Sequence, residues 1–165
     1  MRSINRGPWP IGEDGSRIRF SHYRYAKVPL TERIGDYCSY CERPGDLHVE
    51  HVVPKSVEKQ LKTEWSNFLL GCVNCNSRKS DKNESREGLL WPDRDDTFRA
   101  FAYQSGGRVT VNANLSDDEH HKASALFDLV GLGETGTCTD RRRHRRRQAW
   151  DQAVEVRCLI SNDDS

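Results

Sequence analysis

Apolar residues along this chain occur in short patches between turn residues rather than in long amphipathic repeats. Leu47 to Val53 is rich in β-branched residues and lies between a Pro-Gly-Asp turn and Pro54. This pattern predicts a short strand or hairpin arm. Asn67 to Leu70 predicts a second arm, and Asn76 to Lys82 predicts a short helix directly after it. Two strands followed by a helix are therefore expected at the centre of the chain.

The flanking segments have weaker patterns. Pro29 should divide the region before the centre into two short helical pieces. After the centre, Gly106 and Gly107 between two β-rich runs predict a hairpin, and Ser116 predicts a helix N-cap. A last helix is expected from Arg141 to about Leu159. Its buried face should carry the apolar residues at helical spacing, which are Trp150, Val154 and Leu159 or Ile160.

With 165 residues, the chain is expected to form one domain. The parts in order are an N-terminal arm with short helices (1–35), the central unit (36–88), a β-hairpin with a helical extension (89–160) and a disordered tail (161–165). We expect no membrane span, because no run of about 18 apolar residues occurs. We also expect no signal peptide, because no apolar segment follows the first charges.

Four of the six cysteines form two Cys-x-x-Cys pairs. They are Cys38, Cys41, Cys72 and Cys75. Adjacent pairs of this kind favour a metal over disulfides, and four thiolates would hold a closed, structural Zn²⁺. We therefore expect a reducing, cytoplasmic location. The alternative is a disulfide with free thiols. Cys138 and Cys158 are expected to be packing or surface thiols.

The formal net charge of +1 does not itself indicate a nucleic-acid partner, so the position of the charges matters. Lys55, Arg78, Lys79 and Lys82 lie within or just after the central unit and are candidates for binding phosphates. Arg141 to Arg147 contains six arginines in seven positions. Binding to nucleic acid, contact with an acidic partner protein and a solvated face all remain open for this run.

The most distinctive stretch of the chain is residues 38–82. It reads Cys38-x2-Cys41, Glu50-His51-Val-Val-Pro54-Lys-Ser56, Asn67-Phe-Leu-Leu and Cys72-Val-Asn-Cys75-Asn76-Ser-Arg-Lys79. In this order the motifs resemble the HNH endonucleases with the ββα-metal fold, in particular the zinc-knuckle branch of Septu-type and retron-associated defence nucleases. The resemblance implies an α+β fold, in which a ββα-metal core is stapled by a four-cysteine zinc site and followed by an added β-hairpin and C-terminal helices.

The resemblance also implies a role for each motif residue. His51 would be the general base, Glu50 and Asn76 would hold a catalytic Mg²⁺ or Mn²⁺, and Asn67 would position His51. The chemistry needs these types, since phosphodiester hydrolysis requires a base for water and a cation for the leaving oxygen. Carboxylate and amide oxygens are hard ligands that suit such cations. Glu50 replaces the Asp of several branches, and Asn76 replaces a His.

The resemblance therefore implies an endonuclease that hydrolyses DNA in prokaryotic anti-phage defence, beside an ATPase partner protein. The alternative is a non-catalytic zinc-ribbon module that binds nucleic acid or a partner protein. In that case Glu50-His51 would be a surface dipeptide beside a structural zinc. His48 should face away from His51 on a strand, because three positions separate them. We expect a structural role for it, although contact with metal or phosphate is open.

Overall fold

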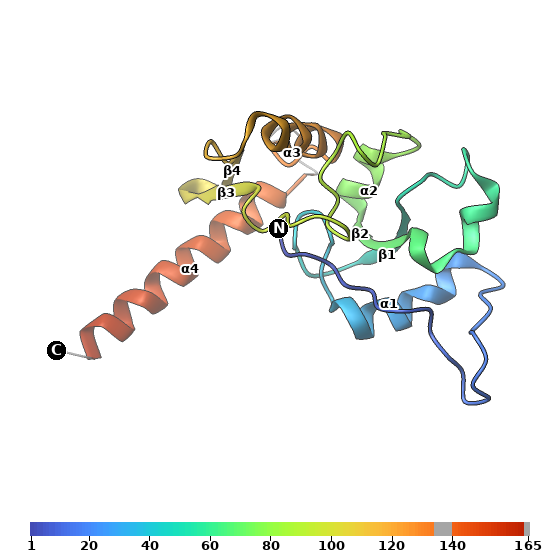
Figure 1. The fold of residues 1–165 in the computed structure, drawn as a ribbon. Helices are drawn as coiled ribbons and strands as arrows, with labels where there is room; N and C mark the ends of the chain where they lie inside the picture. Colours follow the sequence, from blue (N-terminus) through green and yellow to red (C-terminus); the bar gives the residue numbers. More distant parts are fainter. Residues whose placement is uncertain (134–139, 164–165) are drawn as a thin grey trace.

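The computed structural model describes residues 1–133 and 140–163, and Figure 1 shows how their helices and strands are arranged. At the centre, β1 (Leu47–His51) pairs antiparallel with β2 (Phe68–Cys72), and α2 (Val73–Lys79) follows β2 directly. All five residues of β2 are buried, so this strand contributes to the core with both of its faces. The unit confirms the predicted α+β fold with a ββα-metal core. Cys138 and residues 164–165 lie outside the described residues.

The ends of the central elements differ slightly from the predicted ones. β1 stops at His51 rather than Val53. The Val52 N–H still bonds to the Asn67 carbonyl, but the Val53 N–H bonds to the Asn67 side chain instead of continuing the ladder. α2 starts at Val73 rather than near Asn76. The earlier start places the second Cys-x-x-Cys pair across the junction between strand and helix.

The chain before the hairpin forms an arm, residues 1–22, followed by the 3-10 helix η1 (Tyr23–Ala26) and by α1 (Lys27–Ile34). The predicted break at Pro29 is wrong. Pro29 lies in the first turn of α1, where the missing N–H removes no helical hydrogen bond. Leu30 is fully buried, and α1 lies against β2.

Two short 3-10 helices, η2 (Lys59–Thr63) and η3 (Trp65–Asn67), fill the connection between the central strands. Trp65 is buried, and its indole Nε1–H donates a hydrogen bond of 3.1 Å to the carbonyl oxygen of Gly7. The connection therefore holds the N-terminal arm against the core.

The second part of the chain contains the predicted hairpin. β3 (Phe101–Gln104) and β4 (Arg108–Val111) pair antiparallel around the turn η4 (Ser105–Gly107). α3 (Asp117–Leu129) follows, and Ser116 is its N-cap, as the sequence predicts. Ser116 also forms a reciprocal capping box with Glu119.

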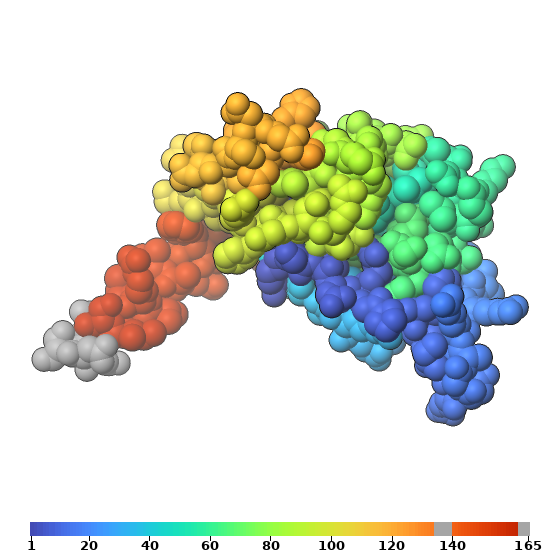
Figure 2. Space-filling view, viewed as in Figure 1, coloured from blue at the N-terminus to red at the C-terminus, as the bar shows by residue number. Residues whose placement is uncertain are grey.

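Helix α4 (Arg142–Asp163) contacts the η4 turn near its N-terminal end and then projects away from the body (Figures 1 and 2). The apolar positions that were expected to be its buried face are exposed instead, with exposed fractions of 38–60% for Trp150, Val154, Leu159 and Ile160. The prediction of a buried face is therefore wrong, because this part of the helix leads away from the core. The helix also includes residues 161–163, which were expected in the tail.

Buried apolar side chains form one cluster that joins both parts of the chain. It extends from Met1 and Leu30 through β2 to Trp91 and Leu126. The N-terminal segment thus shares a core with the ββα unit. Across the described residues, every helix is too short or too polar to cross a membrane.

Candidate active site and metal centre

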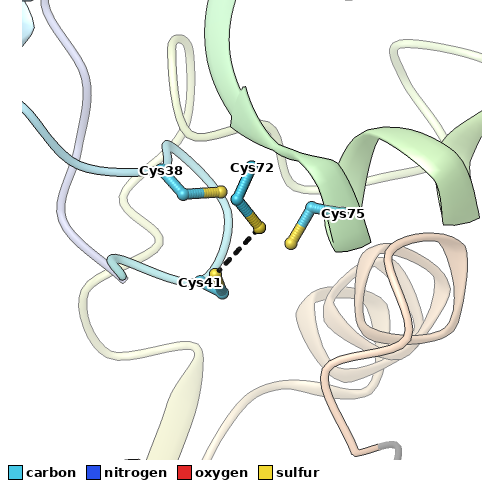
Figure 3. Close-up of side chains that lie close together, drawn as sticks. All are labelled: Cys38, Cys41, Cys72 and Cys75. Atoms are coloured by element: carbon cyan, nitrogen blue, oxygen red, sulfur yellow. Dashed lines mark hydrogen bonds between the residues drawn. The ribbon is translucent and has the colours of Figure 1, made fainter. Parts of the chain in front are cut away.

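The four paired cysteines meet in one buried cluster, which Figure 3 shows in close-up. Their sulfur atoms all lie within 4.8 Å of one another. Cys38 and Cys41 come from the turn before β1, Cys72 ends β2, and Cys75 lies in the first turn of α2. Cys158 stands apart on α4 and is exposed.

The cluster has the dimensions of a metal site rather than of a disulfide. The Cys41 and Cys72 sulfurs are 3.7 Å apart. A tetrahedral site with metal–sulfur bonds of about 2.3 Å requires sulfur separations of about 3.8 Å, whereas a disulfide bond is about 2.05 Å long. The residues therefore fit a closed four-thiolate site with no open position.

Arg142 supplies a buried positive charge to this cluster. Its side chain is 1% exposed, and Nη1 donates to the Cys75 sulfur at 3.3 Å and to the Val130 carbonyl at 2.7 Å. Nη2 donates to the Gly131 carbonyl at 2.8 Å and to the Asp140 carboxylate at 2.7 Å. These bonds tie the start of α4 to a metal ligand, an arrangement that orients ligands in protein metal sites.

Two further members of the arginine run also bond to the protein backbone. Arg143 donates to the Gly106 carbonyl at 3.1 Å, and Arg146 donates to the Gly107 carbonyl at 3.0 Å. Gly107 has φ +69°, and a Cβ there would lie 2.2 Å from the Arg143 carbonyl oxygen, so this close approach requires glycine. The guanidinium groups of these three arginines therefore dock α4 onto the body.

His51 lies at the end of β1, and its ring has a defined hydrogen-bonding state. Nε2 is 3.0 Å from the Lys62 carbonyl oxygen. Because a carbonyl only accepts, Nε2 must carry the hydrogen, and Nδ1 keeps its lone pair. Burial lowers the pKa of the imidazole, and the nearby ammonium groups of Lys55 and Lys79 act in the same direction. His51 is therefore a neutral base at pH 7.

Asn67 is buried between the strands rather than exposed to substrate. Its Oδ1 accepts from the Val53 N–H at 2.8 Å. Its Nδ2 donates to the carbonyls of Val53 at 2.9 Å and Leu61 at 3.2 Å. The amide thus joins the end of β1 to the loop that carries the Lys62 carbonyl.

Glu50 and Lys79 form a buried ion pair. The Glu50 side chain is 2% exposed, and its Oε1 is 2.9 Å from the Lys79 ammonium, which is 0% exposed. The other carboxylate oxygen accepts from the Tyr40 hydroxyl at 2.7 Å, and Lys79 also donates to the His51 carbonyl at 2.7 Å. Burial raises the pKa of the Glu50 carboxyl, and Lys79 opposes that rise.

Glu50, His51 and Asn76 all line one open cavity of about 670 Å³. Gly71 lies between Glu50 and Asn76. A Cβ at this position would lie 3.1 Å from the Glu50 Cβ and 3.7 Å from the Asn76 Cβ. The missing side chain therefore lets a carboxylate and an amide converge from β1 and α2. Each carboxylate oxygen can accept a further bond, so the pair fits a cation that prefers oxygen ligands.

The predicted phosphate-binding residues do not all line the cavity. Lys55 lines the cavity. Arg78 and Lys82 are exposed residues beyond its lining, in and after α2. Lys79 is wrongly placed in this group, because its ammonium is buried against Glu50. His48 lines the cavity, and 50% of its side chain is exposed. Its Nε2 lies 3.4 Å from a carboxylate oxygen of Asp46. This exposure does not support the structural role that was expected for His48.

The comparisons with known proteins match this site. Residues 38–82 match the family model for HNH endonuclease. Septu protein PtuB from Bacillus thuringiensis is 33% identical over 76 residues, a match that covers 43% of this chain and 30% of that protein. The chain thus spans less than a third of the length of this relative.

Residues 38–82 therefore combine the match to the HNH endonuclease family model with a four-cysteine cluster on a ββα core. The known protein to which this chain is similar is Septu protein PtuB.

Several residues of the site were not found from the sequence. Tyr23 and Arg24 line the cavity from η1, well before the motif, and Tyr40 bonds to Glu50 from between two cysteines. Arg142 reaches the metal cluster from α4. These contacts depend on packing between segments far apart in the chain, and no local spacing indicates them.

Proposed function

We propose that this protein is a metal-dependent endonuclease that hydrolyses DNA phosphodiester bonds in prokaryotic anti-phage defence. One observation carries the proposal. A neutral imidazole with its lone pair on Nδ1 lines the same cavity as a carboxylate and an amide from two other positions of the HNH motif. The HNH family match and the similarity to PtuB support a nuclease in defence.

His51 is the proposed general base. Its Nδ1 lone pair takes the proton from the attacking water. The hydrogen bond from Nε2 to the Lys62 carbonyl strengthens as the ring becomes an imidazolium, because a charged donor bonds more strongly. Asn67 acts through position, since it holds the loop that presents this carbonyl.

Glu50 and Asn76 are the proposed ligands of a catalytic Mg²⁺ or Mn²⁺. When bound, such a cation stabilises negative charge on the phosphate and the leaving oxygen. Lys79 and Tyr40 hold the Glu50 carboxylate in place, and the Lys79 ammonium neutralises its charge. The four-cysteine site is proposed to hold a structural Zn²⁺, in agreement with a reducing cytoplasm.

Lys55 at the cavity, with Arg78 and Lys82 beyond it, is proposed to bind the DNA phosphate backbone. A partner protein of the same defence system, an ATPase as the resemblance to Septu-type nucleases implies, is proposed to act with the chain. The similarity to PtuB supports this assignment.

The buried Glu50–Lys79 pair favours a second candidate function, a non-catalytic zinc-ribbon module, because a carboxylate already neutralised by lysine needs no cation. Direct metal binding distinguishes the two functions. The nuclease should bind Mn²⁺ at a site that Glu50→Gln weakens, as measured by the loss of the free Mn²⁺ electron paramagnetic resonance signal. A non-catalytic module should show equal binding in both proteins.

The activity test uses plasmid DNA and the purified chain with Mg²⁺ or Mn²⁺, with and without EDTA. A nuclease should nick or linearise the plasmid only when the divalent cation is available. If folded, zinc-loaded protein leaves the plasmid intact under every metal condition while still binding DNA, the module is the correct function.

A further inference from the structure

We propose that Tyr23, which precedes the HNH domain, is a positioning residue of the active site. Its ring holds the His51 imidazole in the orientation that leaves the lone pair on Nδ1, and its hydroxyl holds the Lys55 ammonium at the cavity for a DNA phosphate. This inference rests on the proposed nuclease function. It adds to the site a residue from outside residues 38–82.

Two aromatic rings pack against the His51 imidazole. The Tyr23 ring centroid is 4.8 Å from it at an interplanar angle of 71°, and the Phe68 ring centroid is 5.3 Å away at 82°. Both contacts have the edge-to-face geometry that aromatic pairs prefer. Among the described residues, the imidazole has one hydrogen bond, from Nε2 to Lys62, to oppose rotation. The two rings therefore supply the remaining restraint on its orientation.

The segment that carries Tyr23 is firmly anchored. Phe20 is buried, with its ring 6.0 Å from the Trp65 ring and 6.3 Å from the Phe68 ring. Ala26, at the other end of η1, is fully buried. Tyr23 is thus fixed on both sides along the chain, and it meets His51 from a rigid element rather than from a mobile loop.

Lys55 is held by the same tyrosine. Its ammonium lies 4.4 Å from the Tyr23 ring centroid and donates a hydrogen bond of 3.1 Å to the hydroxyl. Both residues line the cavity that contains His51, together with Arg24 and Lys27. The segment therefore brings positive charge to the place where the reacting phosphate must lie, although Lys27 is 3.9 Å from Asp46 and shares its charge with it.

Three substitutions separate the two roles of Tyr23. Tyr23→Leu removes both the ring and the hydroxyl, and Tyr23→Phe removes the hydroxyl alone. Tyr25→Leu is the matched control, because Tyr25 lies on the same short helix with 66% of its surface exposed. Tyr23→Met provides a second ring-free variant in case Tyr23→Leu fails to fold. Zinc content and near-ultraviolet circular dichroism establish that each protein is folded.

The first readout is independent of cleavage. Nitrogen-15 spectra of imidazole-labelled protein report the tautomer of His51. The wild type, Tyr23→Phe and Tyr25→Leu should show a protonated Nε2 and a bare Nδ1. In Tyr23→Leu or Tyr23→Met the two signals should move towards each other, because the freed ring exchanges tautomers and loses its bond to Lys62.

The second readout is steady-state cleavage of DNA with Mn²⁺. Tyr23→Leu should lower kcat by about tenfold, the upper range expected for one aromatic contact. Tyr23→Phe keeps the ring, so its kcat should stay within about twofold of wild type. Its KM should rise, because the Lys55 ammonium loses its hydrogen bond to the Tyr23 hydroxyl. Lys55→Met should reproduce this rise in KM without changing the imidazole signals.

A folded ring-free variant with wild-type imidazole signals would overturn the proposal whether or not the protein cuts DNA. A movement of the imidazole signals in Tyr23→Phe equal to that in Tyr23→Leu would also overturn it, since the ring would then have no role. Failure of the wild type to cleave, with the expected changes in the spectra, would instead reject the nuclease function and retain the positioning of His51.

Discussion

Replacing Arg142 by Met should destabilise the protein and weaken its metal site together. The substitution keeps much of the aliphatic volume but removes the guanidinium that bonds to Cys75, Val130, Gly131 and Asp140. The Asp140 carboxylate, with 5% of its side chain exposed, would lose this partner. Removing one member of a buried ion pair costs about 3–5 kcal/mol, because the other charge stays buried.

For a chain of this length such a loss corresponds to a fall in Tm of about 10 °C. Loss of the hydrogen bond to Cys75 should also lower zinc affinity by about 10- to 100-fold. Burial tends to raise the pKa of Asp140, but the bonds from Arg142 outweigh it and the pKa is lowered. The Arg142–Asp140 pair therefore makes its full contribution to the free energy of unfolding at neutral pH. That contribution is lost as the pH falls below 3.8, the ordinary pKa of an aspartate carboxyl, and the Asp140 carboxylate becomes protonated.

Thermal unfolding with zinc bound and zinc release to a colorimetric chelator measure the two effects. Arg145→Met is the matched control, because Arg145 is exposed on the same helix and its loss should change stability by less than about 0.5 kcal/mol. If Arg142→Met unfolds and releases zinc like Arg145→Met, the coupling of α4 to the metal site is refuted.

Three further predictions concern the proposed chemistry, and a fourth concerns the metal site. His51→Ala should reduce cleavage by about 100-fold or more with unchanged zinc content and DNA affinity; equal cleavage by variant and wild type would exclude His51 as the base. Because the pKa of His51 is lowered, the wild-type rate should rise with pH below the ordinary imidazole value of 6.5 and be level at pH 7, so a base limb centred above 6.5 would contradict the assignment. Gly71→Ala should raise the Mn²⁺ concentration required for cleavage, because its Cβ would press on Glu50, and an unchanged metal requirement would contradict convergence of Glu50 and Asn76 at this point. Cys72→Ser should lose most bound zinc and lower the free energy of unfolding, as elemental analysis and urea denaturation can test, because a structural metal contributes folding energy directly.

Features whose physical cause is local could be predicted from the sequence. The spacing of Cys38, Cys41, Cys72 and Cys75 indicated a metal site because thiolates in such pairs have one main use in a reducing environment. Ser116 and the Gly106-Gly107 turn also act within a few residues, through capping and backbone conformation, and both were placed correctly. Pro29 shows the limit of this reasoning, because its effect depends on the exact turn of the helix in which it lies.

The sequence by itself determined the ββα core, the four clustered cysteines and the residue types of the proposed active site, because each depends on residue spacing along a short stretch. Only the tertiary structure decided which charges are buried and which are exposed. Lys79 neutralises Glu50, Arg142 bonds to Cys75, and Tyr23 packs on His51, although in the sequence the lysine and the arginine look like surface residues. The tertiary structure also decided that the outer turns of α4 are exposed, because they project away from the body (Figure 2). Burial and ion pairing depend on which distant segments meet, and the free energy of those contacts is set by the whole core rather than by any local pattern.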